Sequence, residues 1–155
     1  MKSLVYRSRA VRSPTLAALL GLLIESRGHN VAHAITGVLL YVDGGYLQLL
    51  QGEAAEVDAL MAAIARDPRH RDVEVLLDEE HDRAPLFPGW SMGFLHFSAL
   101  EAEVGEGLMR NDEDALERVL HARAGEPEVA LLAEVVQAHA ASLHLPALLA
   151  GRGER

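Results

Sequence analysis

The stretch AITGVLLYVDGGYLQLLQGE, residues 34–53, decides the fold. Its first part, residues 34–42, is a nearly continuous apolar run, which is typical of a central strand. DGG at residues 43–45 predicts a tight turn, and residues 46–51 predict the partner strand. Gln48 stands in that strand among leucines, although a buried carboxamide needs partners for both its donor and its acceptor end. The stretch therefore predicts a hairpin whose second strand carries a buried polar group.

Periodic segments flank this hairpin on both sides. In chain order we expect a strand at residues 3–8, a helix capped by Ser13 and ended by Gly28, the hairpin, an amphipathic helix through residues 57–64 that Asp67 and Pro68 stop, a strand at residues 72–80 and a last strand at residues 91–97. This order predicts an α+β fold, the ferredoxin-like β-α-β-β-α-β-β plan, with a mixed sheet and two helices on one face.

The first and third strands of such a sheet are its adjacent central pair. Tyr6 lies on the first strand and Gln48 on the third, so the two side chains meet in the core if both point to the helix face. A slip of one residue would send either side chain to the opposite face.

The composition after residue 98 favours helices. Residues 111–125 carry acidic residues at their start and basic ones near their end, as a helix dipole prefers. A second helix has one stripe made of Leu132, Val135, Val136, His139 and Leu143. We expect both to pack on the free face of the sheet or on a second subunit, which divides the chain into a sensor domain at residues 1–98 and a helical extension at residues 99–150.

Composition excludes several classes of function. The chain has 155 residues, a net charge of −9 and no cysteine. The negative charge argues against nucleic acid or anionic membrane as a partner, because both need cationic patches. The absence of cysteine excludes disulfides, thiolate metal sites and thiol nucleophiles. No apolar run reaches a membrane span and no signal peptide is visible, so we expect a cytoplasmic protein.

Common catalytic and metal-binding patterns are absent. His29 and His33 are four residues apart, but we expect them in a loop without a third ligand, so we predict no metal site. The glycines at residues 44 and 45 fit a hairpin turn better than a phosphate cradle, and Ser13 fits a helix cap better than a nucleophile. The polar residues in apolar surroundings are Tyr6, Asn30 and Gln48. They either satisfy one another in the core or bind a planar heterocycle between the two helices.

Several separated motifs then appear in a familiar order. They are LVYRS at residues 4–8, HNVAHAITGVLLYVDGGYLQLLQG at 29–52, RDPRH at 66–70 and LFPGWSMGF at 86–94. Together they resemble the BLUF domain, a flavin-binding blue-light sensor, over residues 3–97. Three positions depart from the family pattern: Tyr46 stands where phenylalanine is usual, Gln51 replaces a glutamate, and Glu53 replaces a frequent proline.

The resemblance implies a role for each matching residue. Tyr6 would donate an electron to excited flavin, Gln48 would stand between that phenol and flavin, and Asn30 would pair with the polar edge of the ring. The other implied cofactor-binding residues are Ser8, Leu22, Ser26, Ile64, Asp67, Arg69 and His70. Trp90 and Met92 match a pair of which one or the other member lies near the glutamine in different relatives.

The resemblance also implies a photoreceptor, and not an enzyme. FAD is the expected cofactor, with FMN and riboflavin as alternatives. The strand that carries Trp90 and Met92 would pass the signal through the C-terminal helices to a partner protein, and we expect a homo-oligomer. Two rivals keep the fold without the light response: a ferredoxin-like binding module for another small ligand, and an acylphosphatase-like enzyme that would use Arg9 and Arg12.

Overall fold

The computed structural model describes residues 1–12, 14–42, 44–96 and 115–138. Its elements are β1 (Lys2–Ala10), α1 (Leu16–Ala32), β2 (Thr36–Val42), β3 (Gly45–Gly52), α2 (Ala54–Arg66), β4 (His70–Glu80), β5 (Gly93–His96) and α4 (Pro127–Ala138). Residues 115–122 are helical as well. This order confirms the predicted α+β, ferredoxin-like plan with one added strand and C-terminal helices.

The five strands form one mixed sheet in the order β4-β1-β3-β2-β5. β5 runs parallel to β2, and the other neighbouring strands are antiparallel. β1 and β3 are therefore adjacent, as predicted, and their register places Tyr6 directly opposite Gln48. Gly37 in β2 permits this tight sheet, because a Cβ there would lie 1.9 Å from the backbone oxygen of Leu49.

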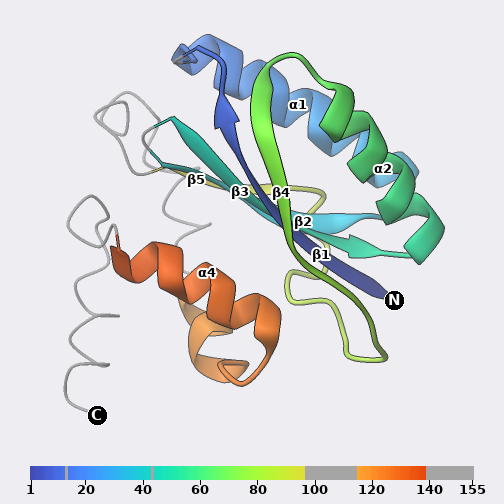
Figure 1. Ribbon diagram of the computed structural model, residues 1–155. Helices are drawn as coiled ribbons and strands as arrows, with labels where there is room; N and C mark the ends of the chain where they lie inside the picture. The colour runs from blue at the N-terminus through green and yellow to red at the C-terminus, as the bar shows by residue number, and fades with distance from the viewer. Residues whose placement is uncertain (13, 43, 97–114, 139–155) are drawn as a thin grey trace.

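The sheet separates two layers of helices (Figure 1). α1 and α2 cover one face, and α4 lies on the opposite face. Leu116, Leu120 and Leu132 are fully buried in this second layer. Complete burial of a leucine side chain is worth about 1.5–3 kcal/mol, which stabilises the C-terminal helices on the sheet. The expected packing on the free face is thus confirmed, whereas residues 97–114, His139 and Leu143 lie outside the described residues.

The ends of α1 differ from the prediction. Thr15 caps the helix by accepting a hydrogen bond from the Ala18 N–H at 3.1 Å, and Ser13 lies outside the described residues. The helix also continues through Gly28 to Ala32. A mid-helix glycine costs about 1 kcal/mol, but here the turn after it places Asn30 in the core, where its side chain is 1% exposed. Tertiary contacts therefore override the local stop signal.

The apolar face of α1 is narrower than its leucine spacing predicts. Leu19 and Leu23 are buried, but Ile24 is 71% exposed. The α2 helix ends as predicted, with Asp67 at its C-cap. In the described part of the chain, no helix combines the length and the apolar character that crossing a membrane requires.

Candidate functional site

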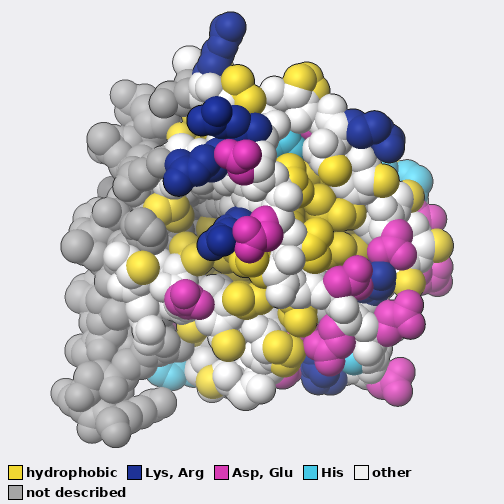
Figure 2. Space-filling model, viewed as in Figure 1, with side chains coloured by type: hydrophobic (Ala, Val, Ile, Leu, Met, Phe, Trp, Pro, Cys, Tyr) yellow, Lys and Arg dark blue, Asp and Glu magenta, His cyan; other side chains and the backbone are white. Residues whose placement is uncertain are grey.

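A cavity of about 810 Å³ lies between the sheet and the helices α1 and α2. Figure 2 shows hydrophobic side chains gathered on the side where the sheet meets these helices, with charged side chains around them. Apart from Ser8, every residue predicted to bind a cofactor lines this cavity: Tyr6, Leu22, Ser26, Asn30, Gln48, Ile64, Asp67, Arg69 and His70. The fold thus brings together residues from three strands, two helices and the turn after α2, although their roles stay predictions.

Tyr6 and Gln48 form the polar centre of the cavity wall. The Tyr6 hydroxyl donates a hydrogen bond to Gln48 Oε1, and both side chains are buried, at 4% and 5% exposure. Burial raises the pKa of the Tyr6 phenol above its ordinary value, because the charged form would lose its hydration. Tyr6 is therefore a neutral phenol, and its proton points at the amide oxygen of Gln48.

The other end of the Gln48 amide faces Met92. Gln48 Nε2 donates to Met92 Sδ at 3.4 Å, and Met92 is 1% exposed. Trp90 instead stacks on Phe87 with ring centroids 5.0 Å apart, and a Cβ at position 93 would run into the Trp90 ring at 2.2 Å. The structure therefore places the thioether, and not the indole, beside the glutamine.

Asn30 is held at one end only. Its Nδ2 donates to the backbone oxygen of Ser91 at 2.6 Å. Its Oδ1 is the one buried side-chain nitrogen or oxygen in the described residues that has no hydrogen-bond partner. A buried acceptor without a partner costs about 1–3 kcal/mol. Because Asn30 lines the cavity, a ligand N–H in that cavity could remove this cost.

Asp67, Arg69 and His70 organise one end of the cavity. Arg69 Nε donates to Asp67 Oδ1 at 3.0 Å, and Arg69 Nη1 reaches Glu25 of α1 at 3.4 Å. The hydrogen bond from Arg69 lowers the pKa of the Asp67 carboxyl below its usual value. The guanidinium thus bridges the end of α2 to α1.

Ser8 does not line the cavity, and its hydroxyl contacts His70 instead. His70 Nε2 lies 2.7 Å from the backbone oxygen of Ile64, so it carries the proton and donates. In the neutral ring, Nδ1 then accepts from the Ser8 hydroxyl at 2.7 Å. These two bonds fix the imidazole edge-on to Tyr6, with ring centroids 6.2 Å apart.

The two histidines considered as metal ligands lie at the end of α1 and not in a loop. Their rings stack with centroids 4.3 Å apart, and His33 Nδ1 lies 2.6 Å from a carboxylate oxygen of Glu56. Among the described residues, no three or more His, Asp or Glu side chains lie together in a way that could hold a metal ion.

The cavity has further lining residues that the sequence analysis did not assign to a cofactor: Val11, Arg12, Pro14, Thr15, Ala18, Glu25, His29, Leu39, Tyr46, Leu60, Ala63 and Pro68. The helical spacing of the sequence would have identified some of these lining residues. Residues 18, 22, 25, 26 and 29 recur at helical spacing on one face of α1, and residues 60, 63, 64 and 67 do so along α2.

Comparison with known proteins identifies the family of this chain. The family model "BLUF: Sensors of blue-light using FAD" matches residues 1–93. The chain is 36% identical over 73 residues to the photoactivated adenylate cyclase subunit beta of Euglena gracilis, a match that covers 47% of this chain and 8% of that protein. It is 29% identical over 77 residues to the blue light- and temperature-regulated antirepressor BluF of Escherichia coli, covering 50% of this chain and 19% of that protein. The matched regions are thus small parts of both relatives.

Solved structures extend the likeness to the C-terminal part. The dark-state structure of BlrB, a BLUF protein, is 31% identical with a TM-score of 0.61, covering 79% of this chain and 96% of that chain. Klebsiella pneumoniae BlrP1, with FMN and cyclic diGMP, is 27% identical with a TM-score of 0.68, covering 88% of this chain and 34% of that one. With the family model matching more than half of its length, the chain belongs to the BLUF family, the sensors of blue light using FAD.

Proposed function

We propose that this chain is a blue-light photoreceptor that holds FAD non-covalently in the cavity between the sheet and α1 and α2. The observation that carries the proposal is the buried Tyr6–Gln48 hydrogen bond in the wall of the same cavity as the partnerless Asn30 Oδ1. When bound, the flavin supplies absorption of blue light and an excited state that accepts an electron. The other flavins, FMN and riboflavin, share this ring system.

The residues of the cavity fit a flavin. Its volume lies in the range that holds cofactors of this size, and Leu22 and Ile64 provide apolar walls on opposite helices. An isoalloxazine ring has one N–H between two carbonyls on its polar edge, and Asn30 Oδ1 is a free acceptor for that N–H. This free acceptor and the apolar walls therefore match the polar edge and the faces of the ring system.

Tyr6 is the proposed electron donor. A phenol gives up an electron and a proton together, whereas a phenyl ring does not. The hydroxyl of Tyr6 already donates to Gln48 Oε1, so its proton has a formed path to the carboxamide. Burial keeps the phenol protonated in the dark, because it raises the pKa of Tyr6.

Gln48 is the proposed switch. A carboxamide carries a donor and an acceptor on one small group, so a reversal or a change of tautomer rewires hydrogen bonds without moving net charge. The Nε2 group donates only to a thioether, which is a weak acceptor, so little is lost when that bond breaks. A reversed Gln48 would turn its N–H donor to the side where Oε1 now accepts from Tyr6. A carbonyl of a bound flavin within its reach would accept that hydrogen bond, which would stabilise the excited state more than the ground state and shift absorption to the red.

The proposed output is a protein contact, and the chain itself is not an enzyme. The segment that holds Met92 also contacts the C-terminal helices, because Arg123 Nη1 donates to the backbone oxygen of Pro85 at 3.0 Å. A change at Gln48 therefore reaches helices that pack on the opposite face of the sheet. The proposed recipient is a second copy of this chain or another protein.

One preparation tests the photoreceptor and its output together. We expect purified protein to be yellow, and blue light to produce a red shift of the flavin band that reverts slowly in the dark. Size-exclusion chromatography of the same sample should give different elution volumes, or different bound partners, in the dark and in light. A colourless protein that stays colourless after addition of flavin would favour the ligand-binding rival, and identical assemblies and partners would exclude the proposed output.

Replacement of Asn30 by alanine should weaken flavin binding about tenfold to a hundredfold, since one hydrogen bond to a buried group is worth about 1–3 kcal/mol. Titration of apoprotein with flavin, followed by quenching of flavin fluorescence, measures the dissociation constant. The control is Gln137→Ala, which removes an exposed amide from α4. Equal affinities of Asn30→Ala and the unmodified protein would show that Asn30 does not contact the cofactor.

A further inference from the structure

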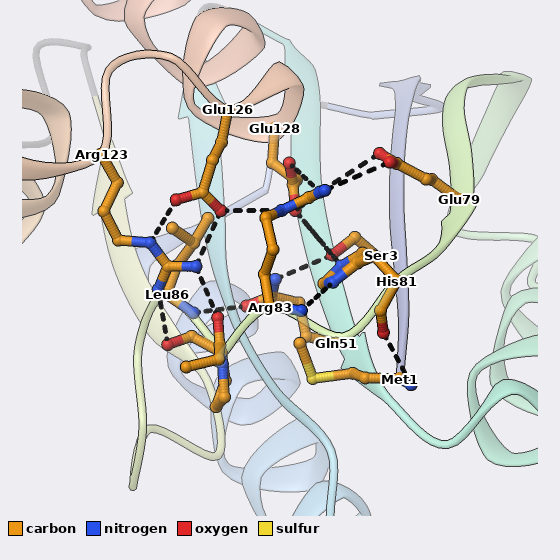
Figure 3. A network of polar contacts seen from close by, with 12 residues as sticks. Met1, Ser3, Gln51, Glu79, His81, Arg83, Leu86, Arg123, Glu126 and Glu128 are labelled. Atoms are coloured by element: carbon orange, nitrogen blue, oxygen red, sulfur yellow. Dashed lines mark hydrogen bonds and ion pairs between the residues drawn. The ribbon is translucent and has the colours of Figure 1, made fainter.

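Gln51 is a second buried glutamine on β3, and its side chain lies on the opposite face of the sheet, where α4 packs. It lies three residues after Gln48, so the alternation of a strand sends the two side chains to opposite sides. Gln51 is 1% exposed, and both ends of its amide are satisfied. Its Oε1 accepts from the Leu86 N–H at 2.8 Å, and its Nε2 donates to Ser3 Oγ at 2.8 Å (Figure 3).

The hydrogen bonds from Gln51 continue in one direction to α4. Ser3 is fully buried, and its hydroxyl donates to Glu128 Oε2 at 2.8 Å. Glu128, in the first turn of α4, is likewise fully buried. A hydroxyl has one proton, and that of Ser3 is donated in the hydrogen bond to Glu128. Ser3 Oγ can therefore only accept hydrogen bonds from its other neighbours. We call the chain from Gln51 Nε2 through Ser3 Oγ to Glu128 Oε2 the relay.

His81 agrees with this direction. Its Nδ1 accepts from the Arg83 N–H at 3.0 Å, so the proton of the neutral ring is on Nε2. Nε2 lies 2.6 Å from Ser3 Oγ and donates to it. Ser3 Oγ therefore accepts hydrogen bonds from Gln51 and His81 and donates one to Glu128. The donor and the acceptor of each of these three bonds are thus fixed.

Arg83 supplies the positive charge that a buried carboxylate needs. Arg83 Nη2 donates to both oxygens of Glu128, at 3.1 and 3.2 Å. The same guanidinium binds Glu79 of β4 and Glu126, just before α4. Arg83 thus links the edge strand, the segment that follows it and the start of α4.

The segment of residues 81–92 reaches both faces of the sheet. On the α4 side, Gln51 holds it through Leu86, and Arg123 holds it through the backbone oxygens of Ala84 and Pro85, at 2.6 and 3.0 Å. On the cavity side, Asn30 binds the Ser91 carbonyl, and Gln48 binds Met92. Two glutamines of β3 therefore bind this segment from opposite faces of the sheet: Gln51 binds it at Leu86, and Gln48 binds it at Met92.

We propose that Gln51 is the positioning residue that couples this segment to α4, with the relay through Ser3 as the connection. Displacement of Met92 when Gln48 switches moves the segment, and the relay transfers that movement to the docked helix. The inference rests on the proposed photoreceptor function for its light-dependent part only. It also gives a role to Gln51, which stands where the resemblance leads us to expect glutamate.

A glutamate at position 51 would break the relay. A carboxylate has no proton to donate to Ser3, so two carboxylates, at positions 51 and 128, would compete for one hydroxyl proton. The contact with the Leu86 N–H would survive, because either residue offers an oxygen there. A matching change at position 128 removes the conflict at Ser3, because an amide at 128 can donate to Ser3, which then donates to the carboxylate at 51. Arg83 then keeps its hydrogen bond to the remaining oxygen of residue 128 and loses the one to Oε2. The relay runs in reverse and keeps a single carboxylate.

Hydrogen exchange of the α4 amides, residues 127–138, tests the relay in the dark. We expect Gln51→Glu to accelerate exchange about tenfold or more, and the double variant Gln51→Glu with Glu128→Gln to restore part of the protection. Glu134→Gln removes an exposed carboxylate from the same helix and should change nothing. Unchanged exchange in Gln51→Glu, or no rescue in the double variant, would overturn the inference. If Gln51→Glu does not fold, Ser3→Ala replaces it and should accelerate exchange in the same helix.

The same measurement under blue light separates the relay from the photoreceptor. We expect light to accelerate α4 exchange in the unmodified protein. Gln51→Glu should retain the full red shift but lose the light-dependent change in exchange. A light response of α4 that persists in Gln51→Glu would exclude Gln51 as the coupling residue and leave the photoreceptor intact. Absence of any red shift in the unmodified protein would instead exclude the photoreceptor, while the dark exchange experiment would still decide the relay.

Discussion

Replacement of Tyr6 by phenylalanine should leave the protein yellow and abolish its light-induced red shift. The ring still fills the same buried position on β1, so the cavity keeps its wall. What is lost is the phenolic hydroxyl, which is both the proposed source of the electron and proton and the donor to Gln48 Oε1. Difference absorption spectra, light minus dark, measure the result, and we expect no shifted flavin band at any light dose.

Tyr46→Phe is the matched control for this experiment. Tyr46 also lines the cavity, and its pKa is raised by burial, as that of Tyr6 is. It lies on β3 opposite Ser8. The Ser8–Tyr46 pair is the next pair after Tyr6–Gln48 whose side chains are on the same face of the sheet. The change removes a hydroxyl from the same cavity without touching the Tyr6–Gln48 hydrogen bond, so the red shift should persist. A shift that survives in Tyr6→Phe and disappears in Tyr46→Phe would transfer the donor role to Tyr46.

Replacement of Gln48 by leucine should also abolish the red shift, for a different reason. Leucine has nearly the size of glutamine but can neither accept from Tyr6 nor donate when reversed, so no rearrangement of hydrogen bonds is left. The phenol remains an electron donor, so the flavin fluorescence of this variant should still be quenched relative to that of Tyr6→Phe. Comparison of the difference spectra and fluorescence lifetimes of the two variants separates electron donation from switching.

A full red shift in Gln48→Leu would exclude the carboxamide as the switch. Gln137→Leu, an exposed amide on α4, controls for the loss of a glutamine as such. Because the Tyr6 hydroxyl would lose its buried acceptor, we also expect Gln48→Leu to be destabilised by about 1–3 kcal/mol. Denaturation in urea measures this cost independently of light.

Local sequence was a good guide to the elements and to the end of α2, but a poor one to both ends of α1. The alternation around Tyr6 and the apolar run before Gly44 predicted strands in the right order, since a strand with one or two buried faces leaves that pattern. The stop signal at Gly28 was wrong, because burial of Asn30 and its bond to Ser91 stabilise one further turn of α1. Capping by Thr15 was missed since Ser13 is by type the better N-cap of the two.

Contacts between distant segments were beyond the reach of pattern reading. The spacing of Trp90 and Met92 did not show which of them meets Gln48. In the structure, Met92 contacts Gln48 and Trp90 stacks on Phe87 instead. The Trp90 ring occupies the space that a Cβ at position 93 would need. The residues near Gln51 in the sequence did not indicate its contacts either. Its partner Ser3 lies 48 residues away along the chain, and Glu128 lies 125 residues from Ser3.

By itself, the sequence determined the order of strands and helices, the pairing of the first and third strands, and the residue types available for binding a flavin. These follow from local periodicity and from the few topologies that such an order allows. The tertiary structure alone decided which side chains share the cavity, which atom of Asn30 lacks a partner, and how Gln51 joins the sensor sheet to α4. Hydrogen bonds fix those outcomes because they depend on direction and distance in space, and a linear pattern of residue types contains neither.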